Sequence, residues 1–157
     1  MIQVGDKIPA ANITVINKDG NNSVSTDEYF AGKKVVLIAV PGAFTPTCSE
    51  THLPGFVVNY DAITAKGIDE VACLSVNDSF VMTSWQAAQN AEHITMVADG
   101  GAAFTKALGV ELDTADFGGV RSKRYSMIIE DGTVTTLNLE EATGFEVSGA
   151  DTILEQL

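Results

Sequence analysis

The distribution of apolar residues along the chain predicts a series of buried strands. Continuous apolar runs rich in β-branched residues are typical of strands that are covered on both faces. Runs of this kind occupy residues 34–40, 71–76 and 94–98, and an early strand is also expected at residues 12–16. Two later runs, at 125–130 and 133–139, flank Asp131-Gly132, a dipeptide that favours a two-residue hairpin turn.

The segments between these runs are predicted to form helices. The expected helical ranges are 26–30 (a short turn), 47–66, 78–90, 101–109 and 148–157. Ser148 is expected to cap the last of them, because a serine hydroxyl can accept a hydrogen bond from a free backbone N–H. Pro54-Gly55 predicts a kink within residues 47–66, since proline cannot donate a helical hydrogen bond.

The alternation of strands and helices indicates an α/β protein with a central sheet covered by helices on both faces. The closing antiparallel hairpin makes this a mixed sheet, and the order of elements resembles the thioredoxin fold. The 157 residues are expected to form one domain, residues 1–157. With 45% hydrophobic residues the chain can bury an ordinary core, so the fold needs neither disulfides nor a structural metal.

The charge of the chain restricts its partners. A formal net charge of −12 argues against nucleic-acid and anionic-membrane binding, since both need a basic surface. After Lys106 the only basic residues are Arg121, Lys123 and Arg124, and the two arginines are the only ones in the chain. This cationic cluster is either a set of ion pairs or the place where an anion, such as a protein thiolate, is held.

Cysteine and histidine content restrict the chemistry further. Two cysteines cannot form a disulfide framework, their spacing is not that of a CxxC zinc pair, and two histidines make no credible metal site. We therefore expect neither a metal nor a cofactor.

The sequence shows no targeting or membrane segment. Residues 1–7 lack the features of a signal peptide, and no run approaches the roughly 20 apolar residues that cross a bilayer. Free thiols suit a reducing compartment, so a cytoplasmic protein is expected.

Cys48 is the strongest candidate for chemistry, because a helix is expected to begin just before it. Either Thr45 is the N-cap with Pro46 at the first helical position, or Thr47 is the cap and Glu50 completes a capping box. Both registers leave Cys48 in the first turn, where free N–H groups and the helix dipole favour a reactive thiolate. In the first register the Thr45 hydroxyl lies close to the sulfur.

A second cysteine is missing where a dithiol site would have one. Thr45 stands three positions before Cys48, at the place of the first cysteine in thioredoxins. The site is therefore expected to use a single thiol. Attack of that thiolate on an electrophile such as a peroxide O–O bond would give a sulfenic acid.

Several segments of the sequence resemble the peroxiredoxin family. Residues 41–48, Pro-Gly-Ala-Phe-Thr-Pro-Thr-Cys, resemble its PxxxTxxC motif, and residues 49–56, Ser-Glu-Thr-His-Leu-Pro-Gly-Phe, resemble the peroxiredoxin 5 or type II branch. Residues 72–78 and 124–127 also match, so the resemblance covers essentially the whole chain. It implies a thiol-dependent peroxidase that reduces hydrogen peroxide and alkyl hydroperoxides.

The resemblance also implies a role for each of four residues. Cys48 resembles the peroxidatic cysteine, and Thr45 the hydroxyl that contacts both the thiolate and the peroxide. Pro41 resembles the proline that shields the sulfur from water, and Arg124 the arginine that reaches the thiolate and polarises the peroxide. Such donors would stabilise the charge that develops as the O–O bond stretches.

The thiol that reduces oxidised Cys48 is expected to come from another molecule. Cys73 lies within a buried strand, where cysteine behaves as a small hydrophobe. Two-cysteine relatives carry a resolving cysteine before the last helix, within the stretch that matches residues 143–148, and Val147 stands in its place. The chain thus resembles the one-cysteine type II enzymes, which implies glutathione with glutaredoxin, or thioredoxin, as reductant.

Two other functions remain open from the residues alone. His52 lies four residues after Cys48, so a Cys–His hydrolase or transferase is an alternative to a supporting role for this histidine. The second alternative function is a redox sensor or holdase on the same scaffold, without fast turnover. The resemblance further implies a homodimer, with Phe44 and Phe80 as candidate interface residues.

Overall fold

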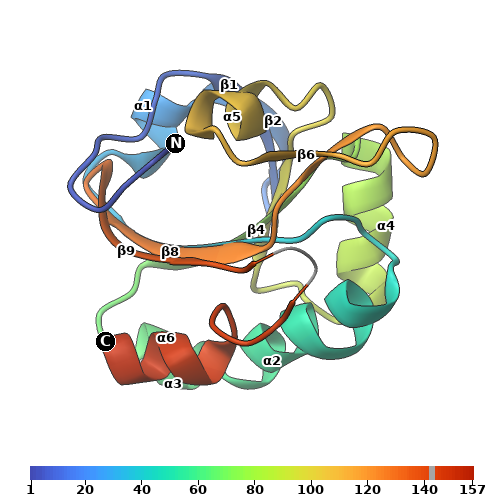
Figure 1. Ribbon diagram of the computed structural model, residues 1–157. Helices are drawn as coiled ribbons and strands as arrows, with labels where there is room; N and C mark the ends of the chain where they lie inside the picture. The colour runs from blue at the N-terminus through green and yellow to red at the C-terminus, as the bar shows by residue number, and fades with distance from the viewer. Residues whose placement is uncertain (142–143) are drawn as a thin grey trace.

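The computed structural model describes residues 1–141 and 144–157. Its main feature is a seven-stranded mixed sheet with the strand order β2-β1-β5-β4-β3-β8-β9 (Figure 1). The strands are β1 (Asn12–Asn17), β2 (Gly20–Ser25), β3 (Lys34–Ala39), β4 (Glu70–Ser75), β5 (Thr95–Ala98), β8 (Tyr125–Glu130) and β9 (Thr133–Leu139). A separate two-stranded hairpin consists of β6 (Glu111–Asp113) and β7 (Val120–Ser122).

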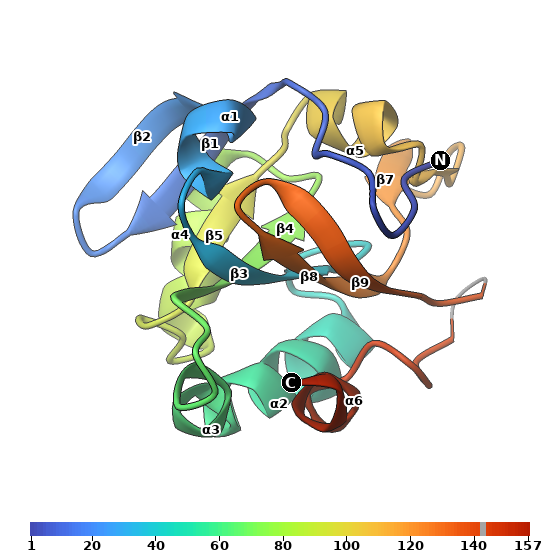
Figure 2. The same cartoon turned by 90° about the vertical axis from the view of Figure 1, so that its left-hand side faces the viewer.

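Helices cover both faces of the sheet, and this arrangement confirms the predicted thioredoxin-like fold. They are α1 (Thr26–Phe30), α2 (Leu53–Val58), α3 (Tyr60–Thr64), α4 (Ser79–Ala88), α5 (Ala103–Leu108) and α6 (Ala150–Gln156), with a π-helical turn, η1, over Cys48–His52. Figure 1 shows α1 and α5 on one side and α2, α3 and α6 on the other. Figure 2, turned by 90°, shows the strands of the sheet between these two layers.

The central strand β3 contributes alternate side chains to two separate cores. Val36 and Ile38 pack with the layer of α2, α3, α4 and α6, whereas Val35 and Leu37 pack with the layer of α1 and α5. Because successive side chains of a strand point to opposite faces, a fully apolar strand needs cover on both. This explains why the run at 34–40 has no polar face.

The positions of the strands and most helices agree with the sequence predictions to within a few residues. The Asp131-Gly132 turn joins β8 and β9 as expected, with φ of 47° and 81°. Three short elements were not predicted. They are β2, whose polar side chains give no strand pattern, and the three-residue strands β6 and β7.

Two helix predictions need correction. The expected helix over 47–66 is divided into η1, α2 and α3, and the irregularities lie before Pro54 and at Asn59. Pro54 occupies the start of α2, where its missing N–H costs least. Ser148 does not cap α6, because Gly149 occupies that position and the serine hydroxyl has another partner.

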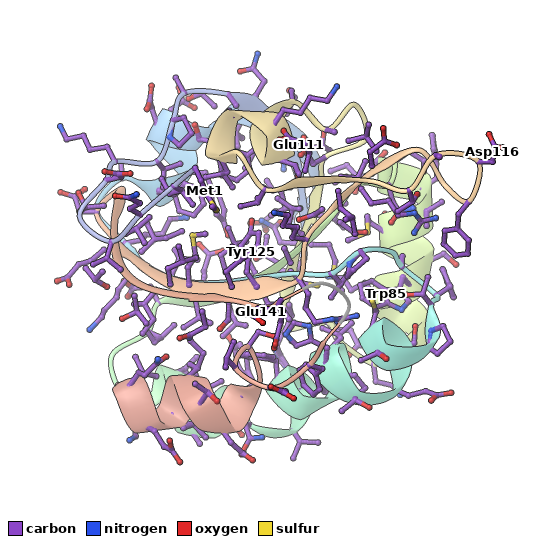
Figure 3. All side chains as sticks on the ribbon, in the orientation of Figure 1. Met1, Trp85, Glu111, Asp116, Tyr125 and Glu141 are labelled. Atoms are coloured by element: carbon purple, nitrogen blue, oxygen red, sulfur yellow. The ribbon has the colours of Figure 1, made fainter. Side chains whose placement is uncertain are left out.

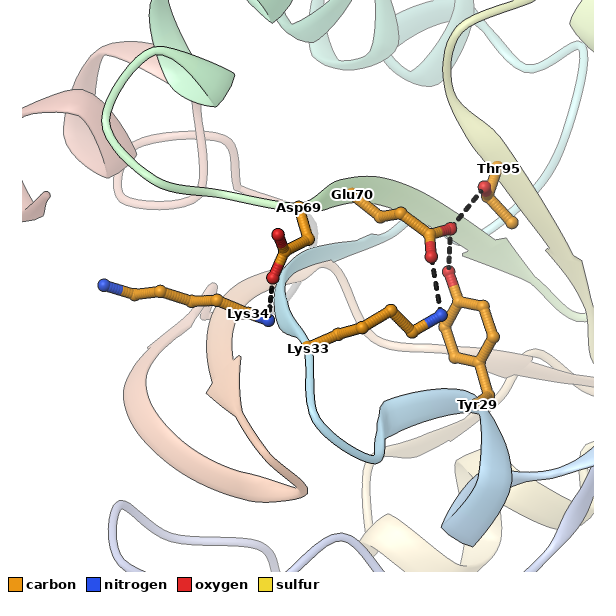
Figure 4. A network of polar contacts seen from close by, with 6 residues as sticks. All are labelled: Tyr29, Lys33, Lys34, Asp69, Glu70 and Thr95. Atoms are coloured by element: carbon orange, nitrogen blue, oxygen red, sulfur yellow. Dashed lines mark hydrogen bonds and ion pairs between the residues drawn. The ribbon is translucent and has the colours of Figure 1, made fainter.

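A polar network joins α1 and the residues after it to the end of the sheet at which β4 and β5 begin (Figure 4). The Glu70 carboxylate accepts hydrogen bonds from the Tyr29 hydroxyl (3.0 Å) and the Thr95 hydroxyl (2.9 Å), and pairs with Lys33 at 2.6 Å. Burial opposes ionisation of Glu70, but these donors outweigh it and lower the pKa of the carboxyl. This network lies at the opposite end of β3 and β4 from Cys48.

In the described ranges, 1–141 and 144–157, we find no helix that is both long and apolar enough to cross a membrane.

Candidate active site

Cys48 reaches its place through a sharp turn after the central strand β3. The backbone N–H of Val40 still bonds to β4, and the chain then turns at Pro41-Gly42. Phe44 takes a left-handed conformation (φ 61°), which redirects the chain so that the helix starts beneath the end of the sheet. Cys48 is therefore in the first helical turn, as predicted, and only 1% of its surface is exposed.

Of the two predicted registers for this turn, the one with Thr45 at the helix boundary is correct. The Thr45 carbonyl accepts the first helical bond, from the N–H of Ser49. Thr47 has helical angles and makes no capping hydrogen bond, so the capping box is wrong. The Thr45 hydroxyl donates to the Gly42 carbonyl (2.6 Å) and makes no hydrogen bond to Cys48 in the described residues.

The π-helical turn sets the spacing between the cysteine and the histidine. The Leu53 N–H bonds to the carbonyl of Cys48, five residues earlier, and both Cys48 and His52 are buried. The buried indole of Trp85, in α4, donates to the hydroxyl of Ser49 at 2.9 Å. Trp85 lies between α4 and this segment (Figure 3), so the turn that carries Cys48 is held from a second element.

The register of β8 against β3 brings Arg124 to Cys48. Tyr125 pairs with Ala39, the last residue of β3. The preceding residue, Arg124, therefore lies just beyond the end of β3, where the chain turns toward Cys48. Nη2 of Arg124 donates to Sγ of Cys48 at 3.1 Å, and Nη1 lies 2.8 Å from Nδ1 of His52. The predicted pairing of the arginine with the cysteine is thus present, across 76 residues of sequence.

The contacts of His52 identify its protonation state. Its Nε2 lies 3.0 Å from the Ser148 carbonyl, which can only accept, so Nε2 carries the proton and Nδ1 accepts from Arg124. Burial and the adjacent Arg124 charge lower the pKa of His52 to about 4, so the ring is neutral at neutral pH. Since its one lone pair faces Arg124, His52 is not placed to act as a base for Cys48.

Arg124 has no carboxylate partner among the described residues, in which the single ion pair is Lys33–Glu70. Only 5% of the Arg124 surface is exposed, and its charge is permanent. A buried charge is costly unless an opposite charge balances it. Of the two side chains that Arg124 contacts by hydrogen bonds, one is a neutral histidine and the other is Cys48. The one charged group that contacts the Cys48 sulfur by a hydrogen bond in the described residues is therefore the Arg124 guanidinium.

Arg121, the other arginine, holds the turn before the cysteine. Its Nη1 donates to the Pro41 carbonyl at 2.9 Å, and the guanidinium lies 5.3 Å from the centre of the Phe117 ring. A side chain at Gly42 would meet this guanidinium, which would have to move and give up its place at the Pro41 carbonyl. Sequence reasoning placed Arg121 in the cationic cluster but missed this contact.

Cys73 is fully buried in β4, between Ile38 of β3 and Met96 of β5 in the sheet register. Burial raises the pKa of its thiol far above the usual range, and the nearby Cys48 adds to this. A thiol in such a place is a packing residue, as the sequence predicted, and not a nucleophile. Both cysteines are free. No cluster of metal-ligating side chains occurs in the part of the chain described by the structure.

A thioredoxin-like sheet that presents one buried cysteine to an arginine defines the class of thiol-based redox proteins, and comparison with known proteins specifies the family. The family model described as Redoxin matches residues 3–154. Peroxiredoxin-2D of Arabidopsis thaliana is 45% identical over 159 residues, which cover 99% of this chain and 98% of that protein. The chain belongs to the peroxiredoxin family, whose members are thiol-dependent peroxidases.

Solved structures agree with this assignment. Reduced Prx3 of Vibrio vulnificus in complex with H2O2 superposes with a TM-score of 0.96 at 59% identity, covering 99% of both chains. Peroxiredoxin 5 of Alvinella pompejana superposes with a TM-score of 0.84 at 34% identity, covering all of both chains.

The low pKa of His52 makes the stability of the protein depend on pH. Between its ordinary pKa of 6.5 and about 4, the unfolded chain binds a proton at His52 and the folded chain does not. The free energy of unfolding should therefore decrease as the pH falls through this range, by at most about 1.4 kcal/mol per pH unit from this residue. In urea unfolding, the stability difference between wild type and His52→Gln should shrink toward acid pH. A constant difference across the range would contradict the assignment.

Proposed function

We propose that the protein reduces hydrogen peroxide and small alkyl hydroperoxides through Cys48. The observation that carries the proposal is the 3.1 Å contact between Nη2 of the buried Arg124 and Sγ of Cys48. The similar Vibrio vulnificus Prx3 has been solved with H2O2 bound, which supports a peroxide as substrate here.

In the proposed reaction the Cys48 thiolate attacks the nearer peroxide oxygen and the O–O bond breaks. Sulfur gives two electrons and gains one oxygen as sulfenate, while the other oxygen leaves as water or alcohol with the proton of the hydroperoxide. Arg124 donates to the sulfur at rest and to the negative oxygens as the bond stretches. The Thr45 hydroxyl would turn from the Gly42 carbonyl to the peroxide, and Pro41 would limit access of water.

We assign the chain to the one-cysteine kind of the type II or peroxiredoxin 5 branch, with an external thiol as reductant. One thiol, from glutathione, condenses with the sulfenic acid to a mixed disulfide and water. A second thiol, from glutaredoxin or thioredoxin, then attacks the glutathione sulfur of this disulfide, forms a new disulfide with it and releases Cys48 as a thiolate. The buried Cys73 and the valine at position 147 support this choice. It fits the reducing cytoplasm, which we propose as the location.

The two alternative functions are less well supported by the geometry. A hydrolase or transferase needs His52 as base, but its Nδ1 accepts from Arg124. A sensor or holdase without fast turnover would not require a buried guanidinium directed at the sulfur.

The first test measures the oxidation of reduced protein by hydrogen peroxide in a stopped-flow instrument. Wild type should react fast, Cys48→Ser should not react, and Cys73→Ser should react like wild type. Arg124→Ala should slow the reaction about 10²- to 10³-fold, because a donor to the developing charge is lost. Lys123→Ala removes the same charge from the adjacent residue and serves as the matched control, with little effect. An equal effect of both substitutions would contradict a local role of Arg124.

The second test concerns the thiol that resolves Cys48. Reduced protein treated with one equivalent of peroxide should gain the mass of one oxygen, and subsequent glutathione should convert it to the glutathione adduct. Glutaredoxin or thioredoxin should then restore the starting mass. The Cys48→Ser variant is the control and should give no adduct. Loss of two hydrogens with both thiols blocked to alkylation would indicate a Cys48–Cys73 disulfide and overturn the one-cysteine assignment.

The third test concerns a homodimer, which we propose to use the exposed aromatic residues near the site. Phe44, Phe80 and Phe117 are 54%, 82% and 80% exposed, and aromatic residues are enriched at interfaces. Sedimentation velocity at micromolar concentration should give twice the 16.5 kDa of the chain. Phe80→Asp should shift it to the monomer, whereas Val58→Asp, at an 81% exposed position of α2, should not. A monomer in the wild type would contradict the proposal.

A further inference from the structure

One buried carboxylate lies close to the active site and has no place in the reaction described above. Glu140 follows β9, and its backbone N–H donates to the carbonyl of Arg124 at 3.0 Å. Only 5% of its surface is exposed. Its side chain accepts hydrogen bonds from the Ser148 hydroxyl (2.6 Å) and from the backbone N–H groups of Glu146, Val147 and Ser148 (each 2.9 Å).

These hydrogen bonds fix the segment 146–148 at the point where it meets His52. The Ser148 carbonyl, one peptide away from the N–H bound by Glu140, accepts from Nε2 of His52. Phe145 covers this contact, since its ring lies 4.9 Å from the His52 ring and 5.9 Å from the Arg124 guanidinium. A continuous series of buried contacts therefore runs from Glu140 through Ser148 and His52 to Arg124.

We propose that Glu140 is a positioning residue for the oxidation of Cys48, acting through His52 and Arg124. The inference rests on the proposed peroxidase function of Cys48. By holding the Ser148 carbonyl against Nε2, Glu140 fixes the His52 tautomer that leaves Nδ1 free to accept from Arg124. With Nη1 engaged there, Nη2 of Arg124 is directed at the sulfur.

An ionised carboxylate is suited to this position because it only accepts hydrogen bonds, and the four groups bound to it in the described residues are donors. Burial opposes ionisation, but the four donors outweigh it and lower the pKa of the Glu140 carboxyl. All four reach Oε2, and the Glu146 N–H also lies 2.9 Å from Oε1. An amide with its oxygen in the place of Oε2 would direct its NH2 group at the Glu146 N–H and would lack the charge that strengthens the other hydrogen bonds. The segment 146–148 would then be held less firmly although its own sequence is unchanged.

Release of this segment has a specific consequence for His52. Burial and the Arg124 charge lower the pKa of His52, whereas the Ser148 hydrogen bond and the Glu140 charge raise it, so loosening the segment changes contributions of both signs. Its direct effect is on the tautomer, because the Ser148 carbonyl is the acceptor that keeps the proton on Nε2. A ring with its proton on Nδ1 cannot accept from Arg124, and Nη1 then loses its partner.

The test compares Glu140→Gln with Glu70→Gln. Both substitutions replace a hydrogen-bonded carboxylate by an amide with the same change in net charge, but Glu70 lies at the far end of the sheet. For each folded variant we would measure the rate of peroxide oxidation of Cys48 and, by ¹⁵N resonance of the labelled imidazole, which ring nitrogen of His52 carries the proton. A merely stabilising carboxylate would lower the unfolding temperature without selectively moving either quantity.

We expect Glu140→Gln to slow oxidation roughly 10- to 100-fold, the range of a misdirected catalytic group, and to give a mixture of the two His52 tautomers instead of the Nε2–H form alone. Glu70→Gln should leave both the rate and the tautomer near wild type. A wild-type rate and tautomer in Glu140→Gln, with a fast wild type, would overturn the inference alone. A slow wild type would instead overturn the proposed peroxidase function.

Two further variants keep the inference testable if Glu140→Gln does not fold. Ser148→Ala removes one donor and leaves the three backbone donors, so it should slow oxidation by a smaller factor than that expected for Glu140→Gln. In a His52→Gln background, Ser148→Ala should have no additional effect on the rate, because the pathway is already interrupted. Equal effects of Ser148→Ala in both backgrounds would show that the segment acts independently of His52 and would contradict the inference.

Discussion

The structure depends on one buried positive charge that is shared between a neutral ring and a sulfur atom. Arg124 cannot lose its proton, and water reaches only 5% of its surface. Its two terminal nitrogens contact Nδ1 of His52 and Sγ of Cys48. Because the histidine is neutral, the sulfur is the one hydrogen-bonded side-chain partner of Arg124, among the described residues, that can take up a negative charge in the proposed reaction. The buried guanidinium is therefore already in place before that charge develops.

Three separate parts of the fold are needed to keep this geometry. The pairing of β8 with β3 delivers Arg124, and the turn after β3 delivers Cys48 in the first helical turn. The π-helical turn then brings His52 to the same guanidinium. The two turns are local in sequence, but the contacts of Arg124 with Cys48 and His52 span 76 and 72 residues. The site therefore exists only when the sheet, the first helices and the segment 146–148 are assembled. The partly buried network around Glu70 lies at the other end of the sheet and, in the described part of the chain, makes no contact with this site.

The sequence contained enough information for the fold class, the buried strands and the pairing of Cys48 with Arg124. The apolar runs and the resemblance of residues 41–48 and 124–127 were sufficient for these. The polar strand β2 was missed because its side chains carry no alternating pattern. Pro54 predicted a kink in the long helix, but no residue pattern marks the π-helical turn before it or the break at Asn59, so the division into three pieces was missed. The role of Glu140 was not predictable, since its partners are mostly backbone N–H groups whose positions depend on the tertiary structure.

The most direct measurement of the central claim is ¹⁵N nuclear magnetic resonance of the Arg124 guanidinium in the reduced protein. If Nη1 and Nη2 are held by different acceptors, they should give two separate resonances, and rotation about the Nε–Cζ bond should be slow. Replacement of Cys48 by serine should shift the resonance of Nη2 more than that of Nη1. A single averaged resonance with fast rotation, like that of an exposed arginine, would show that the guanidinium is not directed at the sulfur and would contradict the account.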